Sequence, residues 1–444
     1  MKLLGRWSLA SLMKLFVDVP YFVLLVILPV AVGLALWMGF TRGLGDAVRL
    51  EVPVQFEVGP AGHAGIAQRD GATVTITKAR GTLTVSRMSA RAGLLWVGLG
   101  VGLIGLSVAL FVLSCLRGIF RTLRDQNPFV AANVSRIRMI GIALILGQLA
   151  GGWAEAWLAS QVAQDVSIPG VTLHADLSLN WWIVFAGAIL LVLAEVFRLG
   201  AEMKGDLEIA RKIQSGLVPG EIFLKNEAEV HARMRPAKTV GGDYYDVLDL
   251  DETRLAIIVG DVTGKGLPAA MLMASVLGSA RALSSAGLRG SALIAALNRH
   301  VCTNTSGGRF VTLFYGELDT TTGKLVYVNA GHNPPILLRA DGRVDRLQPT
   351  AMVLGIMADA TVETGSTELG PSERLLLFTD GYSEAWNKKE EEYGEDRLTA
   401  SLVRAQTLQP PAAVDRLTVD VLSFCGAVPP RDDMTLMLVV RHGV

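Results

Sequence analysis

Long apolar runs without a charged residue constrain this chain more than any other feature. Residues 19–41 form one such run of 23 residues, and residues 92–116 form another of 25. A helix needs about 20 mostly apolar residues to cross the hydrocarbon core of a bilayer. Two further stretches, 139–158 and 178–197, are equally apolar apart from one glutamate each. We therefore predict four transmembrane helices, at about 19–41, 92–116, 139–158 and 178–197.

A cleaved signal peptide is the alternative for the first of these helices. Its apolar run exceeds the roughly 7–15 residues of a signal peptide, and no small-residue cleavage motif follows it. We expect this helix to be retained.

Charge is distributed very unevenly along the chain. Residues 1–200 carry 16 Lys/Arg and 10 Asp/Glu, whereas residues 201–444 carry 25 and 31. The first part is thus as poor in charge as a membrane protein, and the second resembles a soluble domain. Neither shows the clustered basic face that nucleic-acid binding requires. We predict a transmembrane region at 1–197, a connector at 198–219 and a soluble domain at 220–444.

The arginines between the second and third predicted helices set the orientation. Residues 117–138 contain five of them, and residues 158–180 contain no Lys or Arg. The positive-inside rule therefore places 117–138, and with it both termini, in the cytoplasm. The loop 42–91 has seven Lys/Arg, but the rule weakens for longer loops. Because residues 72–78 alternate in polarity, we expect this loop to be a small extracytoplasmic β-rich domain.

The connector has the pattern of an amphipathic helix. Apolar positions recur every three to four residues, at Met203, Leu207, Ala210, Ile213 or Gln214, and Leu217, and Pro219 ends the pattern. Two interpretations remain open. The helix lies on its own domain, or it pairs with a second copy of the chain to form a homodimer.

Acidic turns next to buried strands dominate the C-terminal part. Apolar strands are followed by Asp261 and Asp380, the pair Asp432 and Asp433 precedes another, and Asp243 follows two glycines. A single Asp at a strand end is ordinary turn chemistry. Several of them at one sheet edge would repel one another unless cations lie between them. Oxygen ligands suit Mg²⁺ or Mn²⁺ rather than Zn²⁺, and the three cysteines show no zinc or disulfide spacing.

These turns belong to a series of motifs in a characteristic order. The series is Arg-Pro-Ala at 235–237, Val-Gly-Gly-Asp-Tyr-Tyr-Asp at 240–246, Gly-Asp-Val-Thr-Gly-Lys-Gly at 260–266, Phe-Val-Thr at 310–312, Asn-Ala-Gly-His-Asn-Pro-Pro at 329–335, Phe-Thr-Asp-Gly at 378–381 and Arg-Asp-Asp-Met-Thr at 431–435. Over about 200–442 the chain resembles the metal-dependent protein phosphatases (PPM-type), in the bacterial stage II sporulation and stress-response branch. The N-terminal part is similar to a four-pass bacterial membrane domain with Asn-Pro-Phe at 127–129.

The resemblance implies a fold and a two-metal site. The fold is α+β, a four-layer α-β-β-α sandwich, here preceded by an all-α transmembrane region with the small β-rich loop. Asp261 is similar to the carboxylate that bridges two divalent ions, Mn²⁺ or Mg²⁺, and Asp380 and Asp432 to ligands of one ion each. The remaining positions implied are the carbonyl of Val262 and the carboxylate of Asp246 as ligands, with Asp243, Asp433 and His332 as supporting groups.

The resemblance also implies a function. It is hydrolysis of a phosphoserine or phosphothreonine protein at the bacterial inner (plasma) membrane, with an anti-sigma-factor antagonist as the expected substrate. Arg235 and Lys265 are candidates for binding the substrate phosphate. One alternative is a catalytically weak, phosphatase-like receptor that acts by binding a partner. Another is a different two-metal enzyme, such as a nucleotide cyclase.

Overall fold

The computed structural model describes residues 9–41, 50–58, 78–85, 92–164, 171–177, 179–305 and 308–442. The chain divides into two compact units, Met1–Lys204 and Gly205–Val444. The boundary falls inside the predicted connector, so the second unit begins earlier than residue 220.

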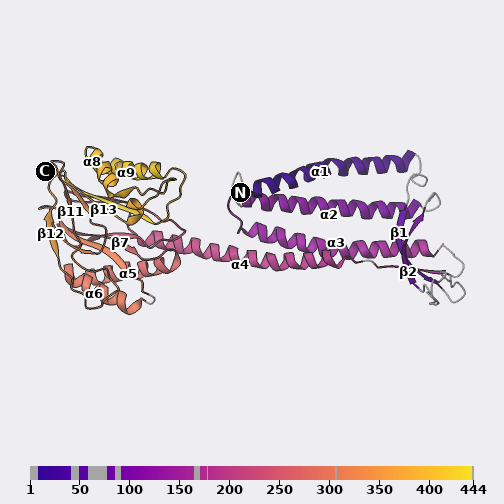
Figure 1. Ribbon diagram of the computed structural model, residues 1–444, viewed down its shortest axis with the longest axis horizontal. Coiled ribbons are helices and arrows are strands. Elements are labelled where there is room, and N and C mark those ends of the chain that lie inside the picture. The colour runs from indigo at the N-terminus through magenta and orange to yellow at the C-terminus, as the bar shows by residue number, and fades with distance from the viewer. Residues whose placement is uncertain are drawn as a thin grey trace, which may run out of the picture. The chain divides into compact units, whose positions relative to one another are not determined.

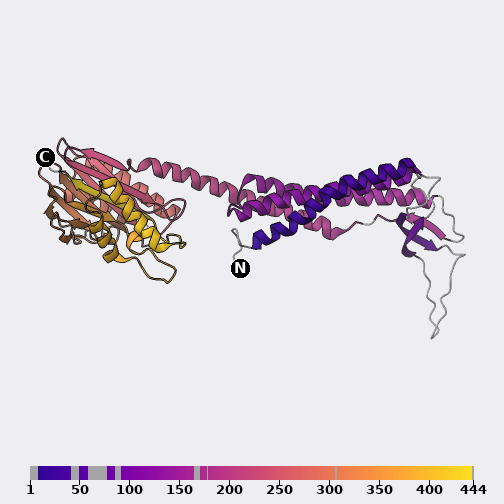
Figure 2. The same cartoon turned by 90° about the horizontal axis from the view of Figure 1, so that it is seen from above.

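Four long helices make up most of the first unit (Figure 1): α1 (Leu9–Thr41), α2 (Ala92–Arg124), α3 (Ala131–Ala163) and α4 (Trp181–Leu217). α1 packs on α2 and α2 on α3, and Figure 2 shows the indigo α1 crossing the purple helices at an angle. Each of the four helices contains a stretch long and apolar enough to cross a membrane. They extend beyond the predicted spans because a helix need not end where its apolar run ends.

A three-stranded sheet packs against one end of α3. β1 (Leu50–Val58) pairs antiparallel with β2 (Lys78–Val85) on one side and with β3 (Val171–Ala175) on the other. Val54 of β1 is buried against Leu158, Ala159 and Val162 of α3. The loop 42–91 therefore contains the expected β-structure. Of the alternating stretch at 72–78, residues 72–77 lie outside the described residues.

The second unit contains two antiparallel sheets. One has the order β11-β10-β13-β14-β5-β4 and the other the order β12-β9-β8-β7-β6. The strands of the first sheet are β4 (Ile222–Lys225), β5 (Ala228–Arg235), β10 (Ile336–Leu338), β11 (Val344–Arg346), β13 (Arg374–Phe378) and β14 (Met434–Arg441). Those of the second are β6 (Tyr244–Asp249), β7 (Arg254–Val262), β8 (Val311–Asp319), β9 (Lys324–Ala330) and β12 (Gly365–Glu368). β8 and β9 are consecutive in the chain and pair antiparallel as a hairpin.

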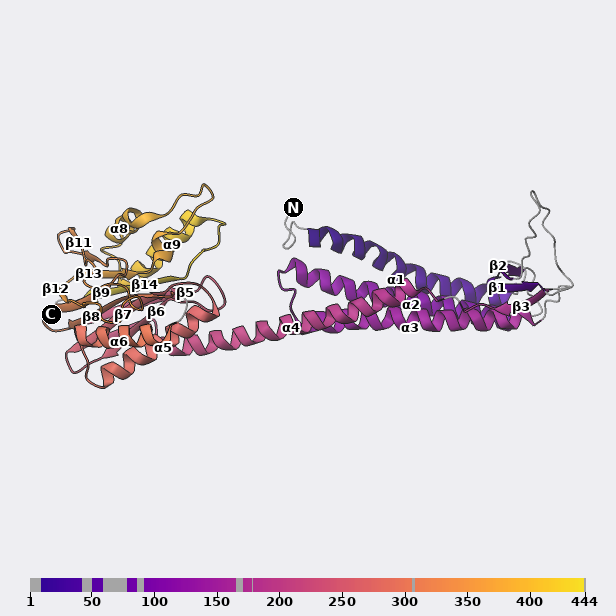
Figure 3. The same ribbon diagram turned by 60° about the horizontal axis from the view of Figure 1, so that its bottom comes forward.

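Alternation along the strands divides the core into three layers. One face of each sheet contributes to a shared apolar core that includes Val230 of β5, Val259 of β7 and Val439 of β14. The helices cover the outer faces (Figure 3). α5 (Leu267–Ser285) and α6 (Gly290–Asn304) pack on the sheet of β6 to β9. α8 (Gly394–Arg404) and α9 (Pro410–Cys425) pack on the other sheet. The short α7 (Asp380–Ser383) follows β13 of that sheet in the chain.

α5 is also apolar enough to be a candidate membrane span. Its buried residues, Met273 and Leu277 among them, pack against the sheet and α6. We therefore regard α5 as a core helix of the second unit.

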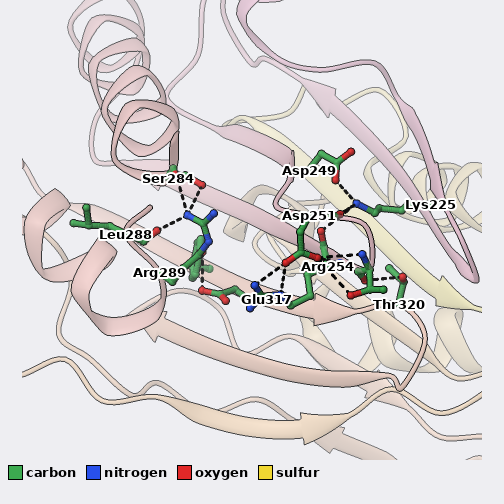
Figure 4. A network of polar contacts seen from close by, with 11 residues as sticks. Lys225, Asp249, Asp251, Arg254, Ser284, Leu288, Arg289, Glu317 and Thr320 are labelled. Atoms are coloured by element: carbon green, nitrogen blue, oxygen red, sulfur yellow. Dashed lines mark hydrogen bonds and ion pairs between the residues drawn. The ribbon is translucent and has the colours of Figure 1, made fainter. Parts of the chain in front are cut away.

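Ion pairs and turn contacts hold one end of this unit (Figure 4). Lys225 bonds Asp249, and Asn226 Nδ2 donates to Thr320 Oγ1 at 2.9 Å. The hydrogen bond from Arg254 lowers the pKa of the exposed Asp251 to about 2. The polar side chains around the β6–β7 turn therefore have hydrogen-bond or ion-pair partners in one another. The Asp residues singled out above lie at the other end of β7, where Asp261 pairs with Thr312.

Candidate active site

Carboxylates from both sheets lie at the end of the second unit where β7 reaches Asp261. Asp261 is next to last in β7, and strand alternation places it on the same face as Ile257 and Val259, between the sheets. Asp380 follows β13 and opens α7, while Asp432 and Asp433 directly precede β14, the neighbour of β13. Asp243 precedes β6. The antiparallel pairing of these strands thus brings together residues up to 190 positions apart in the sequence.

Burial and the neighbouring carboxylates both disfavour negative charge within this group. Burial, and then the charges of Asp380, Asp432 and Asp433, raise the pKa of Asp261 to about 7, although a hydrogen bond with Asp243 acts in the opposite direction. Burial, and then Asp432 and Glu384, raise the pKa of Asp380 to about 6. Burial followed by the charge of Asp261 also raises the pKa of Asp243. Mutually repelling carboxylates held together by a fold are a mark of functional sites.

Asp243 is held by a threonine that the sequence analysis did not single out. Thr379 Oγ1 donates to Asp243 Oδ2 at 2.7 Å. The same hydroxyl oxygen accepts the backbone N–H of Thr435 at 2.9 Å. Thr379 therefore ties the start of β6 to β14 across the two sheets. Its position immediately before Asp380 in the Phe-Thr-Asp-Gly motif was the available signal.

The two adjacent carboxylates before β14 differ in their surroundings. Asp433 is 3% exposed and accepts the backbone N–H groups of Ala237 at 2.7 Å and Gly242 at 2.6 Å. The side chain of Asp432 is 34% exposed, and its Oδ2 lies 2.6 Å from Lys265 Nζ. Asp432 Oδ1 accepts the backbone N–H of Asp433 at 2.9 Å. Asp433 thus supports backbone, whereas Asp432 is the more exposed of the two and pairs with Lys265. Lys265 also donates to the carbonyl of Arg431 at 2.6 Å.

Asp246 does not join the cluster. Its position in β6 faces the helix layer, on the side opposite Tyr245 and Val247 of the inter-sheet core. There Arg281 of α5 donates to both carboxylate oxygens, from Nε at 2.7 Å and from a terminal nitrogen at 3.0 Å. The carboxylate is only 2% exposed. Of the two aspartates in the Val-Gly-Gly-Asp-Tyr-Tyr-Asp motif, the structure therefore brings Asp243, and not the expected Asp246, to the other carboxylates.

The remaining predicted positions lie close to the cluster or at its edge. Val262 is buried, and a Cβ on Gly242 would lie 2.7 Å from its carbonyl oxygen, so the two segments are in close contact. His332 is 1% exposed, its Nδ1 lies 2.9 Å from Thr312 Oγ1, and burial lowers its pKa to about 4. A neutral, buried imidazole suits a packing role better than proton transfer. Arg235 ends β5 and is exposed.

The donor set fits divalent cations of the hard type. All the acidic groups are oxygen donors, and cations between them would relieve the repulsion that raises their pKa values. Among the residues that the structure describes, no three His, Cys, Asp or Glu side chains already surround one point as a finished coordination shell. The cluster is therefore suited to divalent cations because its donors are oxygen atoms and because its carboxylates repel one another.

Comparison with known proteins supports the same assignment. Residues 251–442 match the family described as stage II sporulation protein E (SpoIIE). The C-terminal unit contains a SpoIIE-type domain of the PPM phosphatase branch. Residues 84–209, before this SpoIIE-type domain, match a family described as a protein of unknown function (DUF2975). The resemblance of the C-terminal motifs to the PPM-type phosphatase branch is confirmed.

Individual relatives are similar to part of this chain. The phosphoserine phosphatase RsbU of Bacillus subtilis is 30% identical over 184 residues, which is 41% of this chain and 55% of RsbU. Protein IcfG of Synechocystis is 29% identical over 264 residues, covering 53% of this chain and 42% of IcfG. The solved SiaA-PP2C domain of Pseudomonas aeruginosa is 20% identical, covers 55% of this chain and 99% of that chain, and gives a TM-score of 0.48. The chain spans about half the length of the curated relatives it matches.

Proposed function

We propose that the chain is a membrane-anchored, metal-dependent protein serine/threonine phosphatase. The observation that carries the proposal is the group of buried, mutually repelling carboxylates drawn from both sheets. The SpoIIE-type match and the similarity to RsbU, named as a phosphoserine phosphatase, support it. We assign the sheets and their helices to the four-layer α-β-β-α sandwich class.

In the proposed site, Asp261, Asp380 and Asp432 would hold the Mn²⁺ or Mg²⁺ ions. The carbonyl of Val262 is a further ligand, and Asp243 replaces Asp246 as the early acidic group. When bound, such ions neutralise the phosphate dianion and lower the pKa of a water between them. The chain's own residues keep the acidic groups apart and aligned: Thr379 fixes Asp243, and the N–H groups of Ala237 and Gly242 fix Asp433.

We further propose a membrane topology and a partner. α1 to α4 carry the four spans in the bacterial inner membrane, both termini are cytoplasmic, and the sheet of β1 to β3 is extracytoplasmic. The substrate is a phosphorylated regulatory protein, by analogy an anti-sigma-factor antagonist. The connector forms a homodimer through side chains of α4 that the structure leaves exposed, namely Met203, Ile209 and Ile213, with exposed fractions of 67%, 57% and 61%.

Phosphate release from a phosphoserine protein tests the proposal. We expect the full-length protein in nanodiscs to release phosphate with Mn²⁺, to stop with a chelator, and to recover when Mn²⁺ is restored. Asp380→Asn should abolish release, whereas Asp249→Asn, an exposed change at the opposite end of the unit, should not. Binding of the phosphoprotein without release would support the alternative of a catalytically weak receptor.

A further inference from the structure

One buried side chain of α4 is joined to the backbone of a single residue in the SpoIIE-type unit. Gln214 is 6% exposed. Its Nε2 donates to the carbonyl of Gly241 at 2.7 Å, and the N–H of Gly241 donates back to its Oε1 at 3.2 Å. The neighbouring Ile213 is 61% exposed. Gln214 therefore anchors this part of α4 to the unit, whereas its neighbour Ile213 is exposed.

The segment that Gln214 holds lies tightly between two parts of the carboxylate cluster. A Cβ on Gly241 would lie 2.4 Å from Asp433 Oδ2, and one on Gly242 would lie 2.7 Å from the carbonyl oxygen of Val262. The N–H of Gly242 donates to Asp433 Oδ2 at 2.6 Å, and Asp243 is the next residue. A shift of Gly241 must therefore move at least one of these acidic groups or the Val262 carbonyl.

We propose that Gln214 is a positioning residue for the acidic cluster. It acts through Gly241 and Gly242 on Asp243, Asp433 and the Val262 carbonyl, without touching substrate or metal itself. The proposal rests on the metal-dependent function above. Outer-shell partners of metal ligands typically change metal affinity or activity by about 10–100-fold when mutated.

Gln214→Met is the decisive variant, because methionine keeps the length of the side chain but removes both hydrogen bonds. Ser215→Ala is its control, since Ser215 is exposed and adjacent on the same helix. Both are made in the full-length protein in nanodiscs. Three quantities are measured: hydrogen exchange of residues 237–243, the dissociation constant of Mn²⁺ by calorimetry, and phosphatase kcat and KM at several Mn²⁺ concentrations.

We expect Gln214→Met to speed exchange at Gly241 and Gly242 and to weaken Mn²⁺ binding by about tenfold or more. Its kcat should fall at low Mn²⁺ and recover at saturating Mn²⁺, with KM for the phosphoprotein little changed. Ser215→Ala should match the wild type. A purely structural role would lower the unfolding temperature and leave the Mn²⁺ affinity of the folded protein as it is, which would overturn the proposal.

Failure of the proposed function gives a different result. If the wild type binds no Mn²⁺ and releases no phosphate, the metal-dependent function is wrong, while the exchange experiment still decides whether Gln214 orders residues 237–243. If Gln214→Met does not fold, Gln214→Glu serves instead, because it keeps the acceptor for the Gly241 N–H and loses the donor. Unchanged exchange and affinity in the folded variant would refute the positioning role.

Discussion

Arg281 binds both carboxylate oxygens of Asp246, at 2.7 and 3.0 Å, and the terminal nitrogen that contacts Asp246 also donates to the carbonyl of Leu217 at 2.8 Å. One guanidinium thus joins β6, α5 and the last residue of α4. The negative charge of Asp246 is therefore already compensated by a protein side chain. Asp246 and Asp243, three residues apart, therefore have separate roles.

Asp246→Asn should lower stability and leave metal binding intact. The variant breaks a two-bond contact to a charged partner, which costs about 1–3 kcal/mol. We expect a lower urea midpoint and a Mn²⁺ dissociation constant within about twofold of the wild type, a difference of under 1 kcal/mol. Asp249→Asn is the control on the same strand, because Asp249 is 66% exposed and an ion pair made by an exposed carboxylate is worth about 0–1 kcal/mol. Loss of Mn²⁺ binding in Asp246→Asn would return Asp246 to the ligand set.

Asp261 should make the metal-free protein less stable as pH rises. Its pKa is about 7, against an ordinary value of 3.8, so between these values the folded state binds more protons than the unfolded state. The stabilising contribution of the protonated group is complete below about pH 4 and is lost as pH passes through 7. We expect calorimetry with a chelator to show that Asp261→Asn gains unfolding temperature relative to the wild type at pH 8, and not at pH 4.

The same variant gives the converse result with metal. Asp261→Asn should lose the stabilisation that Mn²⁺ gives to the wild type, together with nearly all turnover. Equal stabilisation of both proteins by Mn²⁺ would contradict the assignment of Asp261 as a metal ligand.

Insertions in α4 should test whether the connector transmits a rotation. One residue added after Glu208 turns the helix by about 100°, and seven added residues restore its phase. This position lies before Gln214, so the contact with Gly241 is retained. We expect activity in membranes and crosslinking between copies to change with one residue and largely to recover with seven. If neither insertion has an effect, the connector is a passive tether.

Membrane topology can be tested with paired reporters. A reporter that works only in the cytoplasm should be active when fused after Val444, because the arginines of 117–138 favour the cytoplasmic side. A periplasmic reporter should be active in the 158–180 loop. The reverse pattern would overturn the orientation.

The motifs identified the cluster well because each one ends or begins a buried strand. They did not separate Asp243 from Asp246. That choice depends on which face of β6 is covered by α5, and on Arg281, which lies 35 residues beyond Asp246. The predicted apolar stripe leaves Ile213 and Gln214 as alternatives, because a helical repeat cannot show that one buried position is an amide with a backbone partner. The four predicted spans overlap α1 to α4, and these helices run longer because polar residues continue them.

The ion pairs at the β6–β7 turn have a consequence for work at different ionic strengths. The carboxylates of Asp249 and Asp251 are 66% and 39% exposed, and at 0.15 M salt exposed charges are screened over about 8 Å. The contacts around Asp433 are buried hydrogen bonds between a carboxylate and backbone N–H groups, which salt weakens much less. Rising salt should therefore loosen the turn at Asp251 and Arg254 before it affects the acidic end. A spectroscopic probe at one end would report a salt-sensitive protein, and a probe at the other end a salt-resistant one.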